Sequence, residues 1–353
     1  MRRPRGQLAA RRALGGCPTV APGTTPPVLV APDAFKGTLT AAEVAAALAD
    51  GLIAGGAAAV ERCPMADGGE GTLAALVDAL GGSTERVAAS SPLGEPVDAE
   101  LGWLSDGTTA VVEVAQASGL ALVPEADRDA EAASSTGTGE LIATALARGA
   151  HQVLVAAGGS ASTDGGAGAL AALADVGAGR RRGGPRITVL CDVQTPYELA
   201  ASRFAAQKGA DAPATRRLSR RLGALARRLP RDPTGVPMTG AAGGLAGGLW
   251  AALDAHLVSG AAFVARSVGL PGRLKRARVV VTGEGRLDRS TLAGKAVAEV
   301  ARAARALGVP AHAVVGRNRL DPFDARILDL QIILEAGTPA QLERAGRELA
   351  GRI

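Results

Sequence analysis

The sequence predicts an α/β protein, and three observations support this class. Short apolar runs rich in β-branched residues, such as Val279–Val281, alternate along the chain with longer segments of helix-forming residues. Apolar residues make up 47% of the 353 residues and aromatic residues only 2%, so alanine, valine and leucine must build the core. A chain of this length has room for two domains with cores of their own.

The first predicted unit is a strand that ends at Ala31, followed by a loop and a helix. The helix opens with a capping box formed by Thr40 and Glu43. The loop between them carries Asp33 and Lys36. Because open α/β sheets bind ligands beyond the carboxyl ends of their strands, both residues are candidates for a functional site.

A second unit of the same kind follows. Its strand ends at Pro64, its loop has the sequence MADGGEGT, and its helix ends at Leu80. Three glycines in the loop expose Asp67 and Glu70. An ordinary acidic turn would account for one such acid, whereas two acids in a second loop of this type favour a binding role.

The pattern changes between residues 82 and 123. Apolar and polar residues alternate there, and Asp106–Gly107 is a hairpin turn between two β-runs. We therefore expect a second α/β domain with a mixed sheet. The predicted division assigns residues 27–81 and 277–353 to one discontinuous domain and residues 82–276 to the other.

The second domain contains another glycine-dense loop. A strand at Gln152–Ala156 leads into residues 158–168, where small residues allow a ligand to approach the backbone. Ser160 and Asp164 offer hydroxyl and carboxylate contacts from this loop. We interpret the loop as part of a binding site.

Three more polar candidates follow the next predicted strand. That strand, Ile187–Leu190, places Asp192 near its carboxyl end, and a later loop brings in Gln207 and Lys208. These positions again lie at the edge of the sheet where ligands bind.

The clearest predicted site is the stretch from Arg278 to Ala304. A buried strand, a polar glycine loop and a helix beginning at Ala296 form a layout that brings backbone N–H groups up to a phosphate. It is not a Walker A loop, since Ala296 stands where a Ser or Thr should follow the lysine. The candidates in this loop are three glycines, two acids and two bases: Gly283, Glu284, Gly285, Arg286, Asp288, Gly294 and Lys295.

Lysine is rare in this chain, since only Lys36, Lys208, Lys275 and Lys295 occur among 39 basic residues. A lysine ammonium is a compact point charge that suits phosphate. Lys36, Lys208 and Lys295 each adjoin a glycine in a motif-like loop, which favours a functional role, and Lys275 is interpreted as a surface residue. The net charge of +5 comes largely from arginine runs without interleaved aromatics, so we expect no nucleic-acid partner.

Other classes of protein are not favoured. Three histidines at scattered positions form neither a nucleophile relay nor a zinc site, and three cysteines form no disulfide pattern. No apolar run is long enough to span a membrane, so we expect a cytoplasmic protein. Residues 1–26 are basic and rich in proline and glycine. We interpret them as a disordered extension, a transit peptide or the product of an upstream start codon, outside the fold.

Seven segments of the chain resemble the motifs of the bacterial glycerate kinase family, and they follow one another in the family's order. The resemblance covers about residues 28–340, but Ser162–Thr163 replaces the family's Thr-Asn, and the segment after CDV is short and lacks its Gly-Pro. The segments are APDAFKGTLTAAEV, PMADGGEGT, STGTGELI, GGSASTDGGAG, CDVQTP with AAQKGA, GAAGGLAGGL and VTGEGRLDRSTLAGK.

The resemblance implies a kinase that uses ATP and Mg²⁺ to phosphorylate D-glycerate, most often at the 2-hydroxyl to give 2-phosphoglycerate. It also implies a flavodoxin-like domain with a parallel sheet, a second α/β domain, and an active site in the cleft between them. A homodimer is compatible with it. Phosphoryl transfer needs little covalent chemistry from the protein and relies on positioning, metal and charge.

Residue roles are predicted on this basis. Asp192 is the predicted general base, because it ends a strand with no lysine beside it, and Asp288 is the predicted magnesium ligand. Lys36, Lys295 and Arg286 are predicted to act on the transferred phosphate. The predicted substrate-binding residues are Asp33, Asp67, Glu70, Ser160, Asp164, Gln207 and Lys208, and the predicted nucleotide-binding residues are Gly283, Glu284, Gly285, Gly294 and Lys295.

Two rival functions remain at this point. A nucleotide- or metabolite-sensing binding protein would need the glycine loops but not so many acids at strand ends. A Rossmann dehydrogenase would need a GxGxxG motif after the first strand, which is not there.

Overall fold

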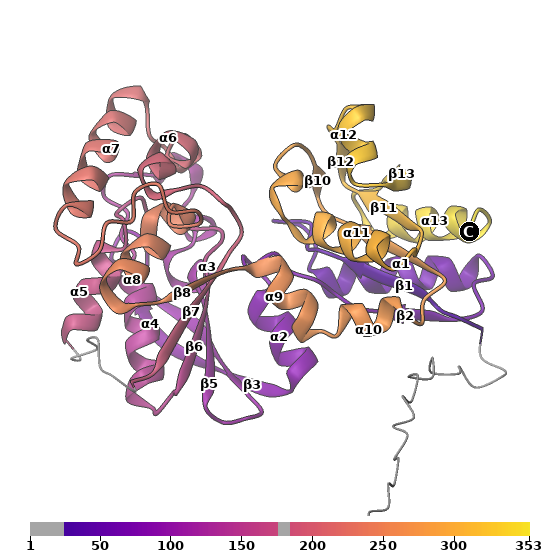
Figure 1. The fold of residues 1–353 in the computed structure, drawn as a ribbon, viewed down its shortest axis with the longest axis horizontal. Coiled ribbons are helices and arrows are strands. Elements are labelled where there is room, and N and C mark those ends of the chain that lie inside the picture. Colours follow the sequence, from indigo (N-terminus) through magenta and orange to yellow (C-terminus); the bar gives the residue numbers. More distant parts are fainter. Residues whose placement is uncertain (1–24, 176–183) are drawn as a thin grey trace, which may run out of the picture.

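The computed structural model describes residues 25–175 and 184–353, which form two lobes, each built on its own β-sheet (Figure 1). Residues 1–24 of the predicted N-terminal extension lie outside the described part. The predicted α/β class, with one parallel and one mixed sheet, is confirmed.

The first sheet has five parallel strands in the order β13-β11-β9-β1-β2. Counted along the chain within this sheet, the order is 2-1-3-4-5, which is the flavodoxin-like arrangement. Its switch point, where successive connections leave in opposite directions, lies between β1 and β9. The strands are β1 (Val28–Pro32), β2 (Val60–Arg62), β9 (Val279–Gly283), β11 (Ala311–Val315) and β13 (Leu330–Glu335).

One face of this sheet is covered by α1 (Ala41–Ala54) and α13 (Pro339–Ala350), and the apolar face of each packs on valines of β1 and β9. The two helices approach closely because Gly51 faces α13; a Cβ there would lie 2.1 Å from the Glu343 carbonyl oxygen. On the other face lies α11 (Ala296–Ala306), with α12 (Pro322–Ile327) following β12. The capping box of Thr40 and Glu43 is present at the start of α1.

The second sheet has six strands in sequential order, β3 to β8. The first three pair antiparallel, and β5 to β8 are parallel, so their carboxyl ends share one edge. The strands are β3 (Gly82–Ser90), β4 (Pro96–Leu104), β5 (Thr109–Glu113), β6 (Gln152–Ala156), β7 (Arg186–Cys191) and β8 (His256–Ser259). The helices of this lobe are α3 (Val114–Ser118), α4 (Thr136–Ala147), α5 (Ala167–Asp175), α6 (Ala200–Phe204), α7 (Ala212–Ala226) and α8 (Leu245–Leu253).

Two helices, α2 (Thr72–Leu80) and α9 (Gly260–Ser267), lie between the two sheets, and α10 (Leu270–Leu274) continues from α9 beneath the first sheet (Figure 1). One continuous apolar cluster joins Leu29 and Val280 of the first sheet to Leu154 and Leu190 of the second through these helices. The two lobes therefore share part of their core.

A small accessory ladder, β10 (Arg286–Leu287) with β12 (Arg317–Asn318), extends from the carboxyl edge of the first sheet. It holds the loop after β9 against the loop after β11. In the described part of the chain no helix is long and apolar enough to cross a membrane.

Candidate active site

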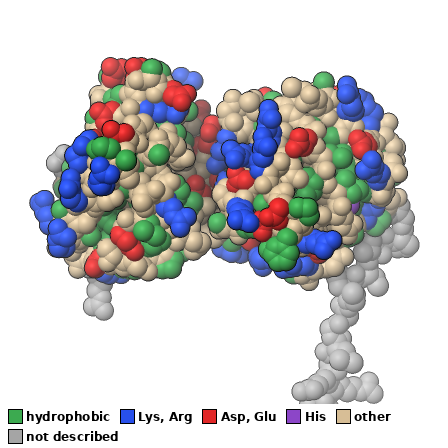
Figure 2. Space-filling model, turned by 90° about the horizontal axis from the view of Figure 1, so that it is seen from above, with side chains coloured by type: hydrophobic (Ala, Val, Ile, Leu, Met, Phe, Trp, Pro, Cys, Tyr) green, Lys and Arg blue, Asp and Glu red, His purple; other side chains and the backbone are tan. Residues whose placement is uncertain are grey.

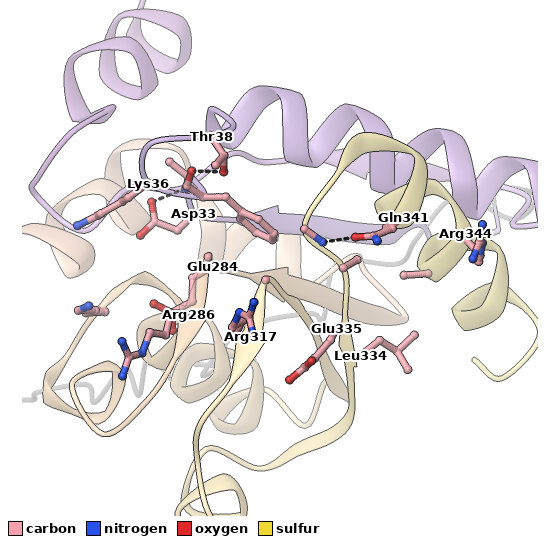
Figure 3. Close-up of a pocket in the computed structure, with 18 of the residues that line it drawn as sticks. Asp33, Lys36, Thr38, Glu284, Arg286, Arg317, Leu334, Glu335, Gln341 and Arg344 are labelled. Atoms are coloured by element: carbon pink, nitrogen blue, oxygen red, sulfur yellow. Dashed lines mark hydrogen bonds between the residues drawn. The ribbon is translucent and has the colours of Figure 1, made fainter. Parts of the chain in front are cut away.

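A cleft of about 950 Å³ runs along the carboxyl edge of the first sheet, where the flavodoxin-like order predicts a ligand site (Figure 3). Its floor comes from the ends of β1, β9, β11 and β13, and α13 closes one side. Asp33, Lys36 and Glu284 lie toward one end, and Gln341 and Arg344 toward the other. The residues predicted from sequence that line it are Asp33, Lys36, Asp67, Glu284, Gly285, Arg286 and Lys295.

Asp33 lies at the switch point itself. Its backbone N–H donates to the Gly283 carbonyl at 2.8 Å, and its side chain is buried. Burial raises the pKa of the Asp33 carboxyl well above its ordinary value, and the negative charges of Asp67 and Glu284 raise it further against the opposing charge of Lys36. Three carboxyl groups, those of Asp33, Asp67 and Glu284, therefore lie close together here with little positive charge to balance them.

Lys36 provides that charge. Its Nζ lies 3.4 Å from Asp67 Oδ2, and its side chain is half exposed to the cleft. The Asp67 carboxylate raises the pKa of Lys36 despite partial burial, and Asp33 and Asp192 act in the same direction. The ammonium stays protonated at neutral pH and is accessible to a ligand.

The loop that carries Asp67 reaches from the first lobe to the carboxyl edge of the second sheet. Gly68 packs on the Leu190 carbonyl and on Gly260, so that a Cβ at Gly68 would lie 2.8 Å from the Gly260 Cα. A Cβ at Gly158 would lie only 2.4 Å from the Gly69 Cα. Backbone contact this close brings the functional loops of both sheets together at one point.

Asp192 lies at that point, just beyond β7. A Cβ at Gly158 would lie 3.3 Å from its Oδ2. Burial and the charge of Asp67 raise the pKa of Asp192 to about 6, while Lys36 and Lys295 lower it. Asp192 is therefore ionised at neutral pH and can become protonated with little free-energy cost, as a general base requires.

Lys208 approaches Asp192 from the second lobe. Its Nζ is buried and donates to Ser160 Oγ at 3.0 Å and to the Ser162 carbonyl at 2.5 Å. Burial lowers the pKa of Lys208 to about 8, against the opposing charges of Asp164 and Asp192. Ser160 and Lys208, each predicted to bind substrate, are thus in contact with each other near the predicted base.

The other predicted substrate residues lie differently. Asp164 is buried, and its two oxygens accept four hydrogen bonds, from the N–H groups of Ser135, Gly166 and Gly168 and from Ser135 Oγ. These contacts fix the loop before α5. Gln207 is exposed, and Glu70 faces a second cleft on the far side of the Lys36 loop. Their substrate-binding roles stay predictions.

The loop after β9 is held by its own hydrogen bonds. Thr291 Oγ1 donates to Glu284 Oε1 at 2.6 Å, and both side chains are buried. Burial raises the pKa of Glu284 to about 7, although Thr291 and Lys295 lower it. Gly285 packs against the backbone of Phe35, which joins this loop to the loop after β1.

The predicted metal ligand, Asp288, lies further along the same loop. Its Oδ1 accepts hydrogen bonds from Ser290 N–H at 2.9 Å and Ser290 Oγ at 2.6 Å, and its Oδ2 lies 3.0 Å from Arg286 Nε. Burial raises the pKa of Asp288, but the Ser290 hydrogen bonds and the charges of Lys295 and Arg286 lower it overall. Gly294 adopts φ +105° and leads into Lys295, the N-cap of α11.

Several cleft residues were not among the sequence candidates. Arg317 lies after β11, Glu335 ends β13, and Gln341 and Arg344 come from α13. Gln341 Oε1 accepts a hydrogen bond from Gly337 N–H at 2.8 Å. The rule that ligands bind at carboxyl strand ends would have found Arg317 and Glu335, whereas nothing in the local sequence marks the α13 residues.

The cleft is rich in charge of both signs. Such a set of side chains suits a phosphate chain with a bound cation. The lining includes the cations Lys36, Arg286, Lys295 and Arg317 and the acids Asp33, Asp67 and Glu284. Within residues 25–175 and 184–353, no three acidic, histidine or cysteine side chains are already arranged around one metal position. Seen from above, a groove separates the two lobes, with charged side chains beside it (Figure 2).

Comparison with known proteins agrees with this arrangement. The model of the glycerate kinase family matches residues 28–178 and 175–348. The glycerate 2-kinase of Escherichia coli K12 is 38% identical over 326 residues, covering 82% of this chain and 84% of that protein. A glycerate kinase of Halalkalibacterium halodurans is 39% identical over 322 residues, covering 82% of this chain and 85% of that protein.

A solved structure is similar over almost the whole chain. The crystal structure of a candidate glycerate kinase 2 from Salmonella typhimurium LT2 superimposes with a TM-score of 0.74 at 32% identity, covering 93% of this chain and 98% of that one. The chain is an enzyme of the kinase class and belongs to the glycerate kinase family.

Proposed function

We propose that the protein transfers the γ-phosphoryl group of ATP to D-glycerate, at the 2-hydroxyl, giving 2-phosphoglycerate and ADP. The observation that carries this proposal is the meeting of Lys36, Asp67 and Asp192 at the end of a charged cleft. The name of the Escherichia coli relative, glycerate 2-kinase, supports the choice of hydroxyl.

The nucleotide lies, in this proposal, along the carboxyl edge of the first sheet. Its phosphates face Lys36, Arg286, Lys295 and Arg317, because a phosphate chain carries the most charge and these are four of the five cations that line the cleft. Its base extends toward Leu334 and Gln341 at the other end (Figure 3).

Magnesium fits this site through its chemistry. Mg²⁺ is bound in kinases by one or two carboxylates together with phosphate oxygens, so the proposal needs no preformed cage. Asp288, whose lowered pKa keeps it ionised, would supply the carboxylate. The bound cation would neutralise charge that develops on the phosphate oxygens.

The acceptor lies on the other side of the junction. Lys208 and Ser160 bind the carboxylate or hydroxyl groups of glycerate, and Asp192 accepts the proton of the attacking hydroxyl. The glycerate oxygen forms a bond to the γ-phosphorus, and the bond from that phosphorus to the bridging oxygen of ADP breaks. Lys36 and Lys295 hold the transferred group in line.

The experiment is an assay of ADP release with D-glycerate, with the product tested directly as a substrate of enolase, which accepts 2-phosphoglycerate but not 3-phosphoglycerate. We expect ADP release that depends on glycerate and an enolase-active product. ADP release with an enolase-inactive product would place the phosphate at the 3-hydroxyl. Binding of both ligands without ADP release would instead favour a sensing protein without catalysis.

A further inference from the structure

Glu113 is a buried acid that connects the two lobes. It is the last residue of β5, and only 2% of its surface is exposed. Its Oε1 accepts a hydrogen bond from Gly71 N–H at 3.0 Å, and its Oε2 accepts one from Leu73 N–H at 3.1 Å. Both donors lie at the N-terminal end of α2, where Gly71 is the N-cap residue. A strand of the second sheet therefore caps a helix that follows β2 of the first sheet.

The helix α2 has no cap of its own. Its N-cap residue, Gly71, adopts a left-handed conformation with φ +88° and supplies no side-chain hydrogen bond. The first N–H groups of any helix need partners that the helix itself does not supply; Thr72 N–H donates to the Gly69 carbonyl, and Glu113 accepts from Leu73 N–H and from the N-cap residue Gly71. When ionised, Glu113 also places a negative charge at the positive end of the helix dipole.

The capped turn directly follows the Asp67 loop. Asp67 Oδ1 accepts a hydrogen bond from Gly69 N–H at 3.0 Å, and Gly71 is bound by Glu113 only two residues later. A shift of Gly71 would therefore move Asp67, which lies 3.4 Å from Lys36 Nζ. The hydrogen bonds of Glu113 to this backbone segment therefore help to set the position of Asp67 at the centre of the candidate site.

This arrangement costs stability that a local cap would not. Burial raises the pKa of Glu113 to about 7 even though both backbone hydrogen bonds lower it, and the acids Glu70 and Glu100 raise it further. A serine or aspartate at the N-cap would satisfy the same helix without burying an acid. Acids held in costly environments are characteristic of functional positions.

We propose that Glu113 is a positioning residue for phosphoryl transfer. Its carboxylate fixes the Asp67–Gly71 loop against the second sheet, so that Asp67 stays paired with Lys36 and opposite Asp192. The proposal rests on the proposed function of the same site, because its readout is glycerate-dependent ADP release.

The test compares Glu113→Gln with Glu140→Gln. Glu140 is a matched control, since its carboxylate also joins two elements, accepting from Ser90 N–H at 2.6 Å and Ser90 Oγ at 2.9 Å, and it does not contact the Asp67 loop. Both variants should lower the melting temperature, because an amide keeps only one of the two accepting oxygens and leaves one donor facing its NH2 group. Only Glu113→Gln should lower kcat, by about tenfold, which corresponds to about 1.4 kcal/mol, with the KM for ATP changed less than about twofold.

A second arm places Glu113→Gln in an Asp67→Asn background. If Glu113 acts by positioning Asp67, the further loss of kcat should be less than about twofold, because residues that act as a unit are not additive. A full tenfold loss in that background would overturn the proposal. If Glu113→Gln does not fold, Glu113→Asp, which keeps the charge but is one methylene shorter, should lower kcat in the same way.

The outcomes separate this inference from the proposed function. A wild-type protein without glycerate-dependent ADP release overturns both. A wild-type protein that turns over, with Glu113→Gln no slower than Glu140→Gln, overturns only the positioning role.

Discussion

At the scale of single residues, the few lysines of this arginine-rich chain lie where a compact charge is most useful. Lys36 pairs with Asp67 at the end of the cleft, Lys208 is buried beside Ser160, and Lys295 faces the same cleft as Lys36. Lys275, which we assigned to the surface, is exposed at the end of α10. An arginine guanidinium is larger and planar and would not fit the same contacts.

We predict that Lys36→Ala and Lys295→Ala lower kcat far more than they lower stability. Loss of a charge partner costs about 2–5 kcal/mol where bound substrates exclude water from the pair, which is roughly 30-fold to several thousand-fold in rate. Steady-state kinetics and melting temperatures measure the two effects separately. Lys275→Ala is the control and should leave both unchanged, and wild-type kinetics in either cleft variant would refute the assignment.

The proposed base makes a prediction about pH. Because the pKa of Asp192 is raised to about 6, the active carboxylate form dominates above that pH, and kcat should fall as pH decreases through about 6. Asp192→Asn should lose turnover at every pH while it still binds MgATP. A variant that keeps turnover and the same acidic limb would assign the proton acceptor elsewhere.

The pH dependence of stability has the opposite sign. The raised pKa means that the folded protein binds the Asp192 proton more tightly than the unfolded chain, so this group favours folding most at low pH. That contribution is lost as pH rises through about 6. Asp192→Asn should therefore melt at a higher temperature than wild type at pH 8, a trade of activity for stability that is common at functional sites.

The predicted metal ligand is tested by magnesium titration. Asp288→Asn removes the ionised ligand and should raise the magnesium concentration needed for half-maximal activity, with less effect at saturating magnesium. Ser290→Ala is a useful companion, because it removes one hydrogen bond to the carboxylate without removing its charge. If Asp192→Asn rather than Asp288→Asn shifts the magnesium requirement, the two roles are exchanged.

At the scale of elements, the close approach of Gly158 to Gly69 decides whether the two functional loops meet. Gly158→Ala places a methyl group where only 2.4 Å is available to the Gly69 Cα. We expect a loss of about 1–3 kcal/mol of stability from overpacking and a loss of turnover of up to about 100-fold from displacement of the site.

The control for this variant is Gly223→Ala in the last turn of α7, where the nearest atom outside the helix backbone is the end of the Arg227 side chain at 3.8 Å. Alanine favours a helix over glycine by roughly 1 kcal/mol, so this variant should be stabilised and fully active. Thermal melts and turnover are compared for both. Unchanged activity in Gly158→Ala would show that the loops tolerate separation.

Local sequence signals predicted many elements well. The predicted strand Gln152–Ala156 and the helix start at Ala296 are confirmed, because a β-branched run and a series of helix formers mark them directly. The strand β8 and the helices α9 and α10 were not predicted, since they are short and their burial depends on the packing of the two lobes. The ladder of β10 with β12 has only two residues in each strand and carries no periodicity.

The same limit applies to the site. Acids and lysines beside glycines at strand ends were found, because their chemistry and spacing are local. The hydrogen bonds of Glu113 to the start of α2 could not be predicted, since their donors lie about 40 residues away along the chain. Gln341 and Arg344 reach the cleft only because α13 packs on α1.

At the scale of the whole molecule, the chain crosses between lobes twice, after α2 and before β9. The predicted division near residues 81 and 277 stays a prediction. The helices α9 and α10 precede the second crossing along the chain, yet their apolar residues share one cluster with those of α2 and α11. The loops of both lobes that carry the candidate site residues meet where Gly158 contacts Gly69.

The shared apolar layer has a consequence for how the molecule melts. Because Leu29, Leu154 and Leu190 belong to one cluster, neither sheet can lose its structure without exposing a face of the other to water. Differential scanning calorimetry should then show a single endotherm whose calorimetric and van't Hoff enthalpies agree, as they do for one cooperative unit. Two resolved endotherms would mean that each lobe melts independently.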